Sequence, residues 1–263
     1  MKNFLIGAAV LTTLAAGPAL AADQAVRVRA HAAAPAWNWT GCYAGSLTGG
    51  GWGRARSSGN GTNNGVANGT PVGADKSSVN IDGYMSGADI GCDYQVGNWV
   101  VGLQGDGSWA YKTGSGFLNA PVFPSNFRED VNERWFASAR ARIGLSWNNL
   151  LVYATGGGAW ANLEMTELNV NLTSASASER HTFSGWTAGG GVELGLLGAS
   201  SFLGGRVTAK AEYLYADLGK HNFFDTTASG CCTSQSTRLT QHMVRFALNY
   251  YFDWAQPAIS SRY

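Results

Sequence analysis

The sequence is poor in charge, and after its first residues it has no apolar run long enough to form a transmembrane helix. Charged residues make up only 13% of the 263 residues, and a helix needs about 20 consecutive apolar residues to cross a bilayer. A helical membrane protein is therefore excluded. The formal net charge of +1 gives no reason to expect nucleic acid as a partner.

The signatures of an enzyme are also missing. The sequence has no phosphate-binding loop, because its glycine runs, such as Gly189-Gly190-Gly191, lie inside segments that alternate like strands. His181 and His242 lie near Ser184 and Thr240, but no Asp or Glu stands at a spacing that completes a catalytic set. We therefore expect no enzymatic activity, no cofactor and no catalytic metal.

The first residues are typical of a secretory signal peptide. Lys2 carries a positive charge, residues 4–14 are almost wholly apolar, and Ala19-Leu20-Ala21 is a small-x-small cleavage site. This segment predicts export through the inner membrane. Residues 22–38, which are rich in alanine and show no periodicity, are typical of a linker.

Glycine and large aromatic side chains are abundant, with 36 Gly, 10 Trp, 10 Tyr and 11 Phe. From Trp39 onward, apolar and polar residues alternate in segments, which is the period of a β-strand with two different faces. The connections alternate in length: about 25 residues, then two at Gly97-Asn98, about 22, two, about 15, about nine and about 19. The eight expected strands cover residues 39–53, 80–96, 99–111, 134–147, 150–165, 181–196, 206–218 and 238–252.

This pattern predicts an all-β fold, an eight-stranded antiparallel up-and-down transmembrane β-barrel with short periplasmic turns and long outer loops. An even number of strands places both ends of the barrel sequence in the periplasm. The expected organisation is a signal peptide over 1–21, a periplasmic linker over 22–38, the barrel over 39–252, and a C-terminal periplasmic extension over 253–263.

The distribution of side chains over the two faces favours a membrane barrel. In residues 134–147, Trp135 and Trp147 share an apolar face, whereas Arg134, Arg140 and Arg142 fall on the other. Aromatic residues at both ends of an apolar face are typical of the girdles of a lipid-facing surface. A secreted β-sandwich or a lipocalin-like barrel is the alternative, and it would turn its apolar residues inward.

The last expected strand resembles the signal by which bacterial outer-membrane barrels are recognised for assembly. Its apolar residues occupy every second position and end in aromatics, and residues 253–263 follow them. The resemblance implies the barrel-assembly machinery as a partner. The residues that carry it are Val244, Phe246, Leu248, Tyr250 and Phe252.

Six sequence blocks occur in family order: Trp39–Gly45, Gly97–Asp106, Ala139–Gly144, Tyr153–Gly157, Gly185–Glu193 and Lys210–Tyr215. Together they resemble the small outer-membrane β-barrel proteins of alphaproteobacteria. That family is similar to the eight-stranded transmembrane domain of OmpA-like proteins, and its members are often labelled porin-like. The resemblance covers residues 39–252 and implies a location in the outer membrane.

Alternation assigns nine charged side chains to the lumen. An eight-stranded barrel is just wide enough inside for its side chains, so these charges are predicted to pair with one another and fill the lumen. A narrow pore for small solutes is the alternative. The nine residues are the acids Asp89, Asp93, Asp106, Glu193 and Glu212 and the bases Arg140, Arg142, Lys210 and Arg245.

Four cysteines in an oxidising compartment allow three disulfide connectivities. Antiparallel pairing of the first two strands brings Cys42 and Cys92 together near the periplasmic rim. Because Cys42 alternates with Tyr43, it is expected to face inward while Cys92 faces outward, so a bridge between them requires a bulge. Cys231 and Cys232, adjacent in the last outer loop, are left to bond each other, to reach another chain or to stay free.

Three functions remain open. The leading hypothesis is a structural barrel that contributes to envelope integrity, with outer-membrane lipids and lipopolysaccharide as partners. The second is a narrow small-solute porin. The third is a surface binding protein that acts through its outer loops on haem or a host surface, for which His221, Cys231 and Cys232 are the only candidate ligands. The sequence gives no indication of the oligomeric state.

Overall fold

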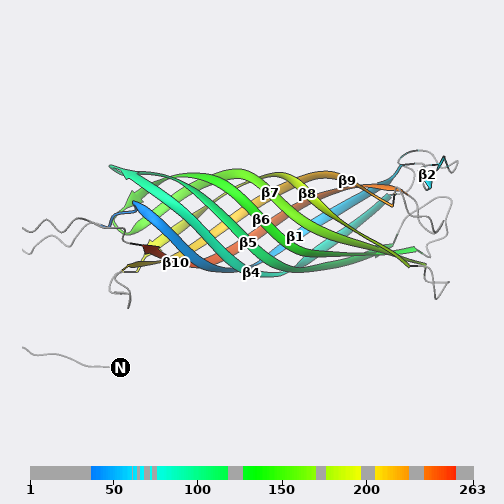
Figure 1. Ribbon diagram of the computed structural model, residues 1–263, viewed down its shortest axis with the longest axis horizontal. Helices are drawn as coiled ribbons and strands as arrows, with labels where there is room; N and C mark the ends of the chain where they lie inside the picture. Colours follow the sequence, from blue (N-terminus) through cyan, green and yellow to red (C-terminus); the bar gives the residue numbers. More distant parts are fainter. Residues whose placement is uncertain are drawn as a thin grey trace, which may run out of the picture. The chain divides into compact units, whose positions relative to one another are not determined.

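Eight antiparallel strands close into one barrel, in which each strand pairs with the next along the chain and the last pairs with the first (Figure 1). The predicted fold class is therefore confirmed. The computed structural model describes residues 37–60, 62–63, 66–67, 72, 76–117, 127–169, 176–196, 205–224 and 234–252. The barrel strands are β1 (Gly41–Gly59), β4 (Lys76–Val96), β5 (Trp99–Phe117), β6 (Phe127–Trp147), β7 (Leu150–Asn169), β8 (Ser176–Gly195), β9 (Arg206–Phe223) and β10 (Gln235–Phe252).

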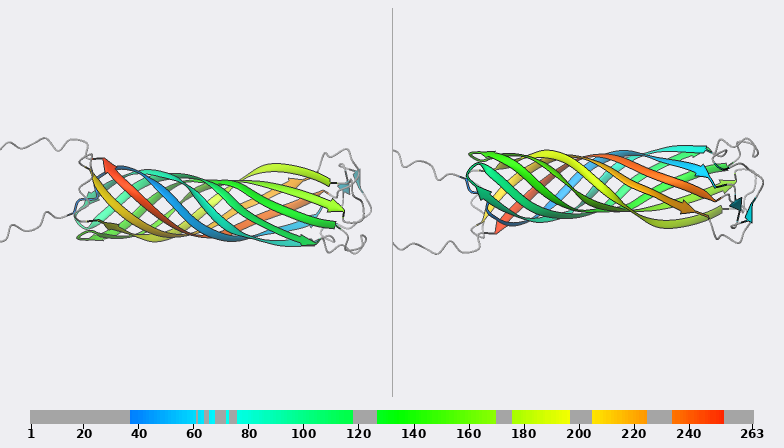
Figure 2. Two further views of the ribbon diagram at one scale, coloured as in Figure 1. Left: turned by 90° about the horizontal axis from the view of Figure 1, so that it is seen from below. Right: turned by 90° about the horizontal axis from the view of Figure 1, so that it is seen from above.

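The strands are inclined to the long axis of the barrel on every side, as closure of a sheet requires (Figure 2). Outside the barrel, β2 (Thr62–Asn63) and β3 (Val66–Ala67) form a small two-stranded pair in the connection between β1 and β4. The described residues contain no helix that is long and apolar enough to cross a membrane.

The two ends of the barrel differ in their connections. At one end, on the left of Figure 1, two-residue turns join β4 to β5 and β6 to β7. Gly97 and Asn148 open these turns with positive φ, a conformation that glycine adopts freely and asparagine tolerates. We call this the turn end and the opposite end the loop end. Both termini of the barrel sequence lie at the turn end, as predicted from the even number of strands.

The predicted segments that flank the barrel lie largely outside the described residues. These are the signal peptide over 1–21, the linker up to residue 36, and the extension over 253–263. The described strands begin at Gly41 and end at Phe252, so the boundaries of these flanking segments stay predictions.

An apolar band bounded by aromatic residues surrounds the barrel on its outer face. Trp99 and Trp109 on β5 are ten residues apart, and both are more than half exposed. Ten residues at about 3.3 Å each, on a strand tilted by about 40°, span about 25 Å, which is the height of the apolar band of an outer-membrane barrel. Tyr84 with Tyr94 on β4, and Leu150 with Trp160 on β7, repeat this spacing. The outer face therefore has the dimensions of a lipid-facing surface.

The strands continue beyond this band at the loop end, farther than the sequence predicted. β5 runs to Phe117 instead of ending at residue 111, and β6 begins at Phe127 instead of at residue 134. The connection between them is therefore residues 118–126, which is shorter than the predicted loop of about 22 residues. At the turn end the predicted strand limits agree with the structure to within two residues.

The reason is that the alternation inverts beyond the band. On β4, Val79 and Ile81 are fully buried inside the barrel, whereas Ser78, Asn80 and Asp82 are exposed outside. The loop-end part of the barrel thus has a polar exterior and an apolar interior, like a soluble barrel. A prediction based on an apolar outer face ends each strand where that face becomes polar.

The direction that the alternation predicts for the Arg134 side chain is wrong. The pairing of β6 with β7 shifts register between Glu133 and Trp135, and this bulge turns Arg134 to the outside. There it forms an ion pair with Glu164 (Nη2 to Oε2, 2.5 Å) with more than half of the Arg134 side chain exposed. The alternation places Arg134 on the same face as Arg140 and Arg142, because a pattern read without interruption cannot show a bulge.

The lipid-facing band predicts position-dependent costs for outward charges. Leu103→Arg places a charge near the middle of the band, and we expect it to lower the free energy of unfolding in lipid vesicles by about 2–4 kcal/mol. The matched variant Thr113→Arg, outward on the same strand but beyond Trp109, should cost less than about 1 kcal/mol. Urea titration of the folded barrel measures both, and equal costs would show that no apolar band exists.

Candidate functional site

Two arginines and two carboxylates form a closed ring of ion pairs at the centre of the lumen. Arg140 contacts Asp106 (Nη2 to Oδ1, 2.8 Å) and Glu212 (Nη1 to Oε2, 3.0 Å). Arg245 contacts the same two acids, Asp106 (Nη1 to Oδ2, 2.7 Å) and Glu212 (Nη2 to Oε1, 2.5 Å). Because β5 and β6 lie opposite β9 and β10 in the closed strand order, this central ring connects opposite walls of the lumen.

A second layer of charges lies toward the turn end. Arg142 forms ion pairs with Asp93 and with Glu193 (Nη1 to Oε2, 2.8 Å). Its guanidinium lies 5.0 Å from the centre of the Tyr43 ring and 5.2 Å from that of Tyr153. These are distances of favourable cation–π contact, so Arg142 is held by opposite charges and by aromatic faces.

Hydroxyl groups supply further donors to the carboxylates, which outnumber the cations. Tyr251 donates to Asp93 (2.7 Å) and Tyr153 donates to Glu212 (3.0 Å). Thr208 donates to Glu193 at 2.5 Å. At these three carboxylates the hydroxyls bond lone pairs that the cations leave unfilled, inside a barrel where an unpaired carboxylate oxygen is costly.

The structure places all nine predicted lumenal charges inside the barrel, each with 8% or less of its surface exposed. The remaining pair is Lys210 with Asp89, and Lys210 Nζ also lies 5.6 Å from the centre of the Tyr43 ring. Every one of the nine therefore contacts a charge of opposite sign. The arrangement binds opposite walls of the lumen together.

Aromatic residues close the lumen at the turn end. Trp39, Tyr43, Tyr153 and Tyr251 are buried there with Val100 and Leu151 in one cluster. The expectation that Tyr43 faces outward, on which the predicted direction of Cys42 depends, is therefore wrong.

Glycines on the neighbouring strands make room for two of these rings. Tyr43 lies directly opposite Gly91, and Tyr153 directly opposite Gly191. A Cβ atom at Gly91 would lie 2.5 Å from the Tyr43 hydroxyl, and one at Gly191 would lie 2.7 Å from the Tyr153 hydroxyl. Each tyrosine thus lies over a glycine that has no side chain to displace it.

The loop-end half of the lumen is filled by a large apolar cluster that the sequence prediction missed. Phe136, Phe183, Met85, Leu214 and Met243 belong to it, and all are 1% exposed or less. The predicted salt-bridged interior is therefore only the turn-end part of the lumen, and an apolar core follows it toward the loops.

A further buried ion pair lies in this loop-end half. Lys112 Nζ contacts Glu133 (Oε1, 2.9 Å), and Gln241 donates to Glu133 (Oε2, 2.6 Å). Lys112 has the same parity on β5 as Asp106, so a longer predicted strand would have found it. Glu133 lies beyond the bulge at Arg134, where the parity of the sequence gives the wrong face.

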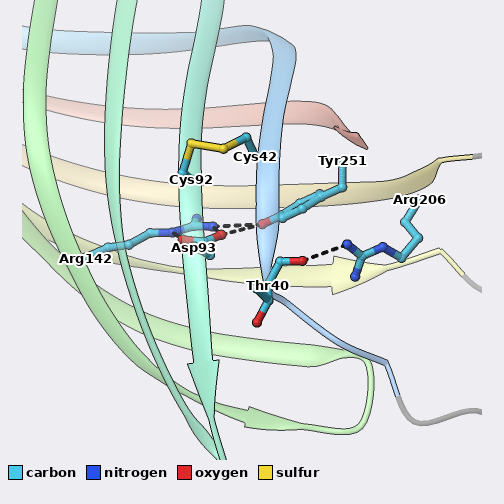
Figure 3. Close-up of a disulfide and its surroundings, with 7 residues drawn as sticks. All are labelled: Thr40, Cys42, Cys92, Asp93, Arg142, Arg206 and Tyr251. Atoms are coloured by element: carbon cyan, nitrogen blue, oxygen red, sulfur yellow. Dashed lines mark hydrogen bonds and ion pairs between the residues drawn. A yellow bond between two sulfur atoms is a disulfide. The ribbon is translucent and has the colours of Figure 1, made fainter. Parts of the chain in front are cut away.

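A disulfide joins Cys42 to Cys92 near the turn end (Figure 3). The two residues are directly opposite on β1 and β4, and the register between these strands runs without a shift. The expected bulge is therefore absent. Because Tyr43 and Asp93 face inward, both cysteines face outward, and the expectation that Cys42 faces inward was wrong. Cys231 and Cys232 lie outside the described residues.

The strand that resembles the assembly signal closes the barrel against β1, with Phe252 opposite Cys42. Val244, Phe246, Leu248 and Phe252 are exposed on its outer face. Tyr250, the fifth residue of the predicted set, packs its ring against Phe252 with the two ring centres 5.2 Å apart.

The three histidines that were considered as ligands or bases lie at the loop end or at the border of the apolar band. His221 stacks on His181 with ring centres 4.3 Å apart, and His181 Nε2 lies 3.4 Å from Glu179. His242 stacks on Trp52. Among the residues that the structure describes, no group of three or more His, Cys, Asp or Glu side chains is placed to hold a metal ion.

Comparisons with known proteins place this arrangement among bacterial envelope proteins. A family described as "Outer membrane protein beta-barrel domain" matches residues 6–252. The 31 kDa outer-membrane immunogenic protein of Brucella melitensis is 32% identical, over 96% of this chain and all of the relative. The 25 kDa outer-membrane immunogenic protein of Brucella abortus is 29% identical, over 83% of this chain and 82% of the relative.

Solved structures with related folds are more distant. The attachment invasion locus protein Ail of Yersinia pestis is 12% identical with a TM-score of 0.37, and the match covers 81% of this chain and 99% of Ail. The outer membrane protease OmpT of Escherichia coli is 8% identical with a TM-score of 0.44, covering 81% of this chain and 97% of OmpT. The strand pairing of this chain itself shows the closed eight-stranded barrel.

The central ring predicts a large cost for removing one of its members. Arg245→Ala leaves Asp106 and Glu212 buried with only part of their compensation, and we expect the free energy of unfolding to fall by about 3–5 kcal/mol. Arg134→Ala removes an arginine from an exposed pair and should cost less than about 1 kcal/mol. Urea unfolding of the barrel in detergent micelles compares them, and equal losses would contradict the closed, dry ring.

The disulfide predicts a covalent link that peptide mapping under non-reducing conditions detects. The mapping should find Cys42 joined to Cys92, and a link from either residue to Cys231 or Cys232 would contradict the structure. The double variant Cys42→Ser/Cys92→Ser should lower the free energy of unfolding by up to roughly 4 kcal/mol, the chain-entropy value for a loop of about 50 residues. Its matched control is the wild-type protein unfolded with reductant present.

Proposed function

This chain belongs to the outer-membrane β-barrel family and is an outer-membrane protein, and from that premise we propose that it is a non-conducting structural barrel that contributes to the integrity of the envelope. The observation that carries the proposal is the filled lumen. The charge layers of Arg142 and of the central ring are followed by the apolar cluster around Phe136 and Phe183.

A filled lumen leaves no route for hydrated solutes. A conducting pore of this size would need a continuous line of water, whereas Arg140 and Arg245 each bridge the same two carboxylates across the lumen. Opening the pore would break four ion pairs at once and then separate an apolar core that water does not enter. The proposed role requires no catalytic step, and the outer-membrane lipids around the apolar band are its direct partners.

A second role, in surface recognition, is favoured by the part of the barrel beyond the apolar band. On β5 eight residues follow Trp109 before the strand ends at Phe117, which at about 3.3 Å per residue and about 40° of tilt extends roughly 20 Å beyond the band. The Brucella relatives are named immunogenic proteins, which supports exposure of this part at the cell surface. We propose that this rim, rather than the lumen, meets the surroundings of the cell.

Conductance across planar bilayers tests the closed lumen. We expect the purified wild-type protein, folded and reconstituted, to show no steady opening events, because the central ring blocks the lumen. The double variant Arg140→Ser/Arg245→Ser removes both cations of the ring and is expected to raise leakage above the wild-type level, provided that the shift in gel mobility on heating shows a folded barrel. Discrete, long-lived openings of the wild-type protein would overturn the proposal and favour a porin.

A further inference from the structure

Charge is unevenly distributed over the outer face of the barrel beyond the apolar band. On β6, β7 and β8 every outward cation contacts a carboxylate. Arg134 and Arg180 both contact Glu164 (2.5 and 3.1 Å), and Arg128 contacts Asp130 (2.8 Å). This side of the barrel therefore compensates its own charge.

The opposite side has an excess of positive charge. On the outer face of β1, β4, β9 and β10 beyond the band, five cations stand against two acids. Among the described residues no carboxylate lies within ion-pair distance of Arg54, Arg56 or Lys220, and only Arg238 is paired, with Asp217. The five cations are Arg54, Arg56, Lys76, Lys220 and Arg238, and the two acids are Asp82 and Asp217.

Three of these cations lie side by side across three strands. Arg56 on β1 is directly opposite Arg238 on β10, and Arg238 is directly opposite Lys220 on β9. Like charges directly opposite one another destabilise a sheet. We call these three cations, Arg56, Arg238 and Lys220, together with Arg54 on β1, the basic ladder. Asp217 compensates Arg238 alone, so these cations keep an excess of positive charge that a bound anion would stabilise.

An open groove of about 490 Å³ runs beside the ladder. Its lining includes Arg54, Arg56, Asn80, Asp82 and His242, so that two guanidinium groups stand against one carboxylate. Asn80 accepts a hydrogen bond from Arg54 Nε (3.0 Å), which fixes that guanidinium and leaves its terminal nitrogens free to bind a ligand. The groove thus offers cationic and polar groups together.

The floor of the groove is aromatic. The ring of Trp52 stacks on that of His242, with ring centres 5.7 Å apart and planes inclined by 11°. Tyr213 contacts His242 Nδ1 at 2.6 Å and fixes the imidazole. Trp52 is half exposed, so a ring face of the pair is available to pack against the apolar face of a sugar.

The height of the ladder matches the headgroup layer of a membrane. Arg54 and Arg56 follow Trp52 by two and four residues on the same face. At about 3.3 Å per residue and about 40° of tilt, they lie roughly 5 and 10 Å beyond the aromatic border of the apolar band. This is the level at which phosphate groups of membrane lipids lie, and guanidinium groups bind phosphate through paired hydrogen bonds.

We propose that the basic ladder and its groove bind the phosphorylated sugar headgroup of a glycolipid in the outer leaflet. The phosphates lie between Arg56, Arg238 and Arg54, and the sugar packs on Trp52. The inference rests on the outer-membrane location of the apolar band and not on the closed lumen. It specifies one side of the barrel, β1, β9 and β10, as the side that orders lipid.

The test compares two double variants that each remove two outward arginines. Arg56→Gln/Arg238→Gln disrupts the ladder, and Arg134→Gln/Arg180→Gln on the opposite side is the matched control. Each folded protein is reconstituted in nanodiscs with a diphosphorylated lipid A and, separately, with its dephosphorylated form. Native mass spectrometry then counts the glycolipid molecules that remain bound after release from the disc.

We expect the wild-type protein and the control variant to retain the phosphorylated glycolipid at least about tenfold more than the ladder variant does. The dephosphorylated form should be retained weakly by all three. Equal retention by the ladder and control variants, or equal retention of the two lipids by the wild type, would overturn the proposal.

Inorganic phosphate distinguishes a lipid site from a site for the free anion. We expect millimolar inorganic phosphate to leave bound glycolipid in place, because the sugar and acyl chains contribute to binding. Displacement of the glycolipid by phosphate at that concentration would assign the ladder to the free anion instead. A folded, non-conducting ladder variant with unchanged lipid retention would overturn only this inference, whereas conductance of the wild type would overturn the proposed function alone.

Removal of the ladder should not prevent folding. Arg56→Gln relieves a like-charge contact with Arg238, so in uncharged detergent the midpoint of urea unfolding should stay equal or rise. In phosphorylated glycolipid the same variant should lose stabilisation that the wild type gains. A midpoint that falls equally in both environments would contradict a role in lipid binding and show a structural one.

Discussion

The narrow interior of an eight-stranded barrel is the constraint on which the rest of this structure depends. Charged side chains that point into it have no bulk water to solvate them, so each requires a partner of opposite sign. Arg140 and Arg245 meet this requirement by sharing Asp106 and Glu212, and the sharing joins opposite walls. The same contacts that satisfy the charges therefore fill the lumen between its opposite walls.

The barrel consists of two zones with opposite alternation. Within the apolar band the side chains outside are apolar and those inside are polar, as Leu103 and Gln104 on β5 illustrate. Beyond the band the pattern reverses, with Ile81 inside and Asp82 outside on β4. One set of continuous strands thus serves two solvents, lipid around the first zone and water around the second. The aromatic residues mark the border between them, and the basic ladder begins just beyond it.

Much of this architecture could be predicted from the sequence. A period of two over eight segments is enough to give the strand number, the two-residue turns and the inward position of the nine charges, because burial of one face determines the parity of every residue on it. Parity fails where the chain inserts a residue, and the bulge at Arg134 shows that failure. Parity also assigns the wrong face where a side chain lies outside its usual environment. Tyr43 is aromatic yet lies inside the barrel, over Gly91. For this reason the predicted direction of Cys42 was also reversed.

The apolar cluster around Phe136 and the basic ladder were beyond the reach of sequence pattern for a different reason. Both depend on which strands are neighbours and on the register between them. Arg56 and Arg238, which are far apart in the chain, lie directly opposite one another only because of that register. The role proposed for the outer face therefore depends on the strand order and the register, which a sequence pattern does not show. The proposed lipid and surface roles both use the outer face and the rim, because ion pairs and then apolar side chains fill the lumen.

Hydrogen exchange of the arginine side chains, measured by NMR on the wild-type protein in lipid, tests the dry, ion-paired lumen most directly. The guanidinium protons of Arg140 and Arg245 should exchange slowly with water, while those of Arg54 and Arg56 on the outer face exchange fast. Equally fast exchange at all four arginines would show water throughout the interior and contradict the closed barrel.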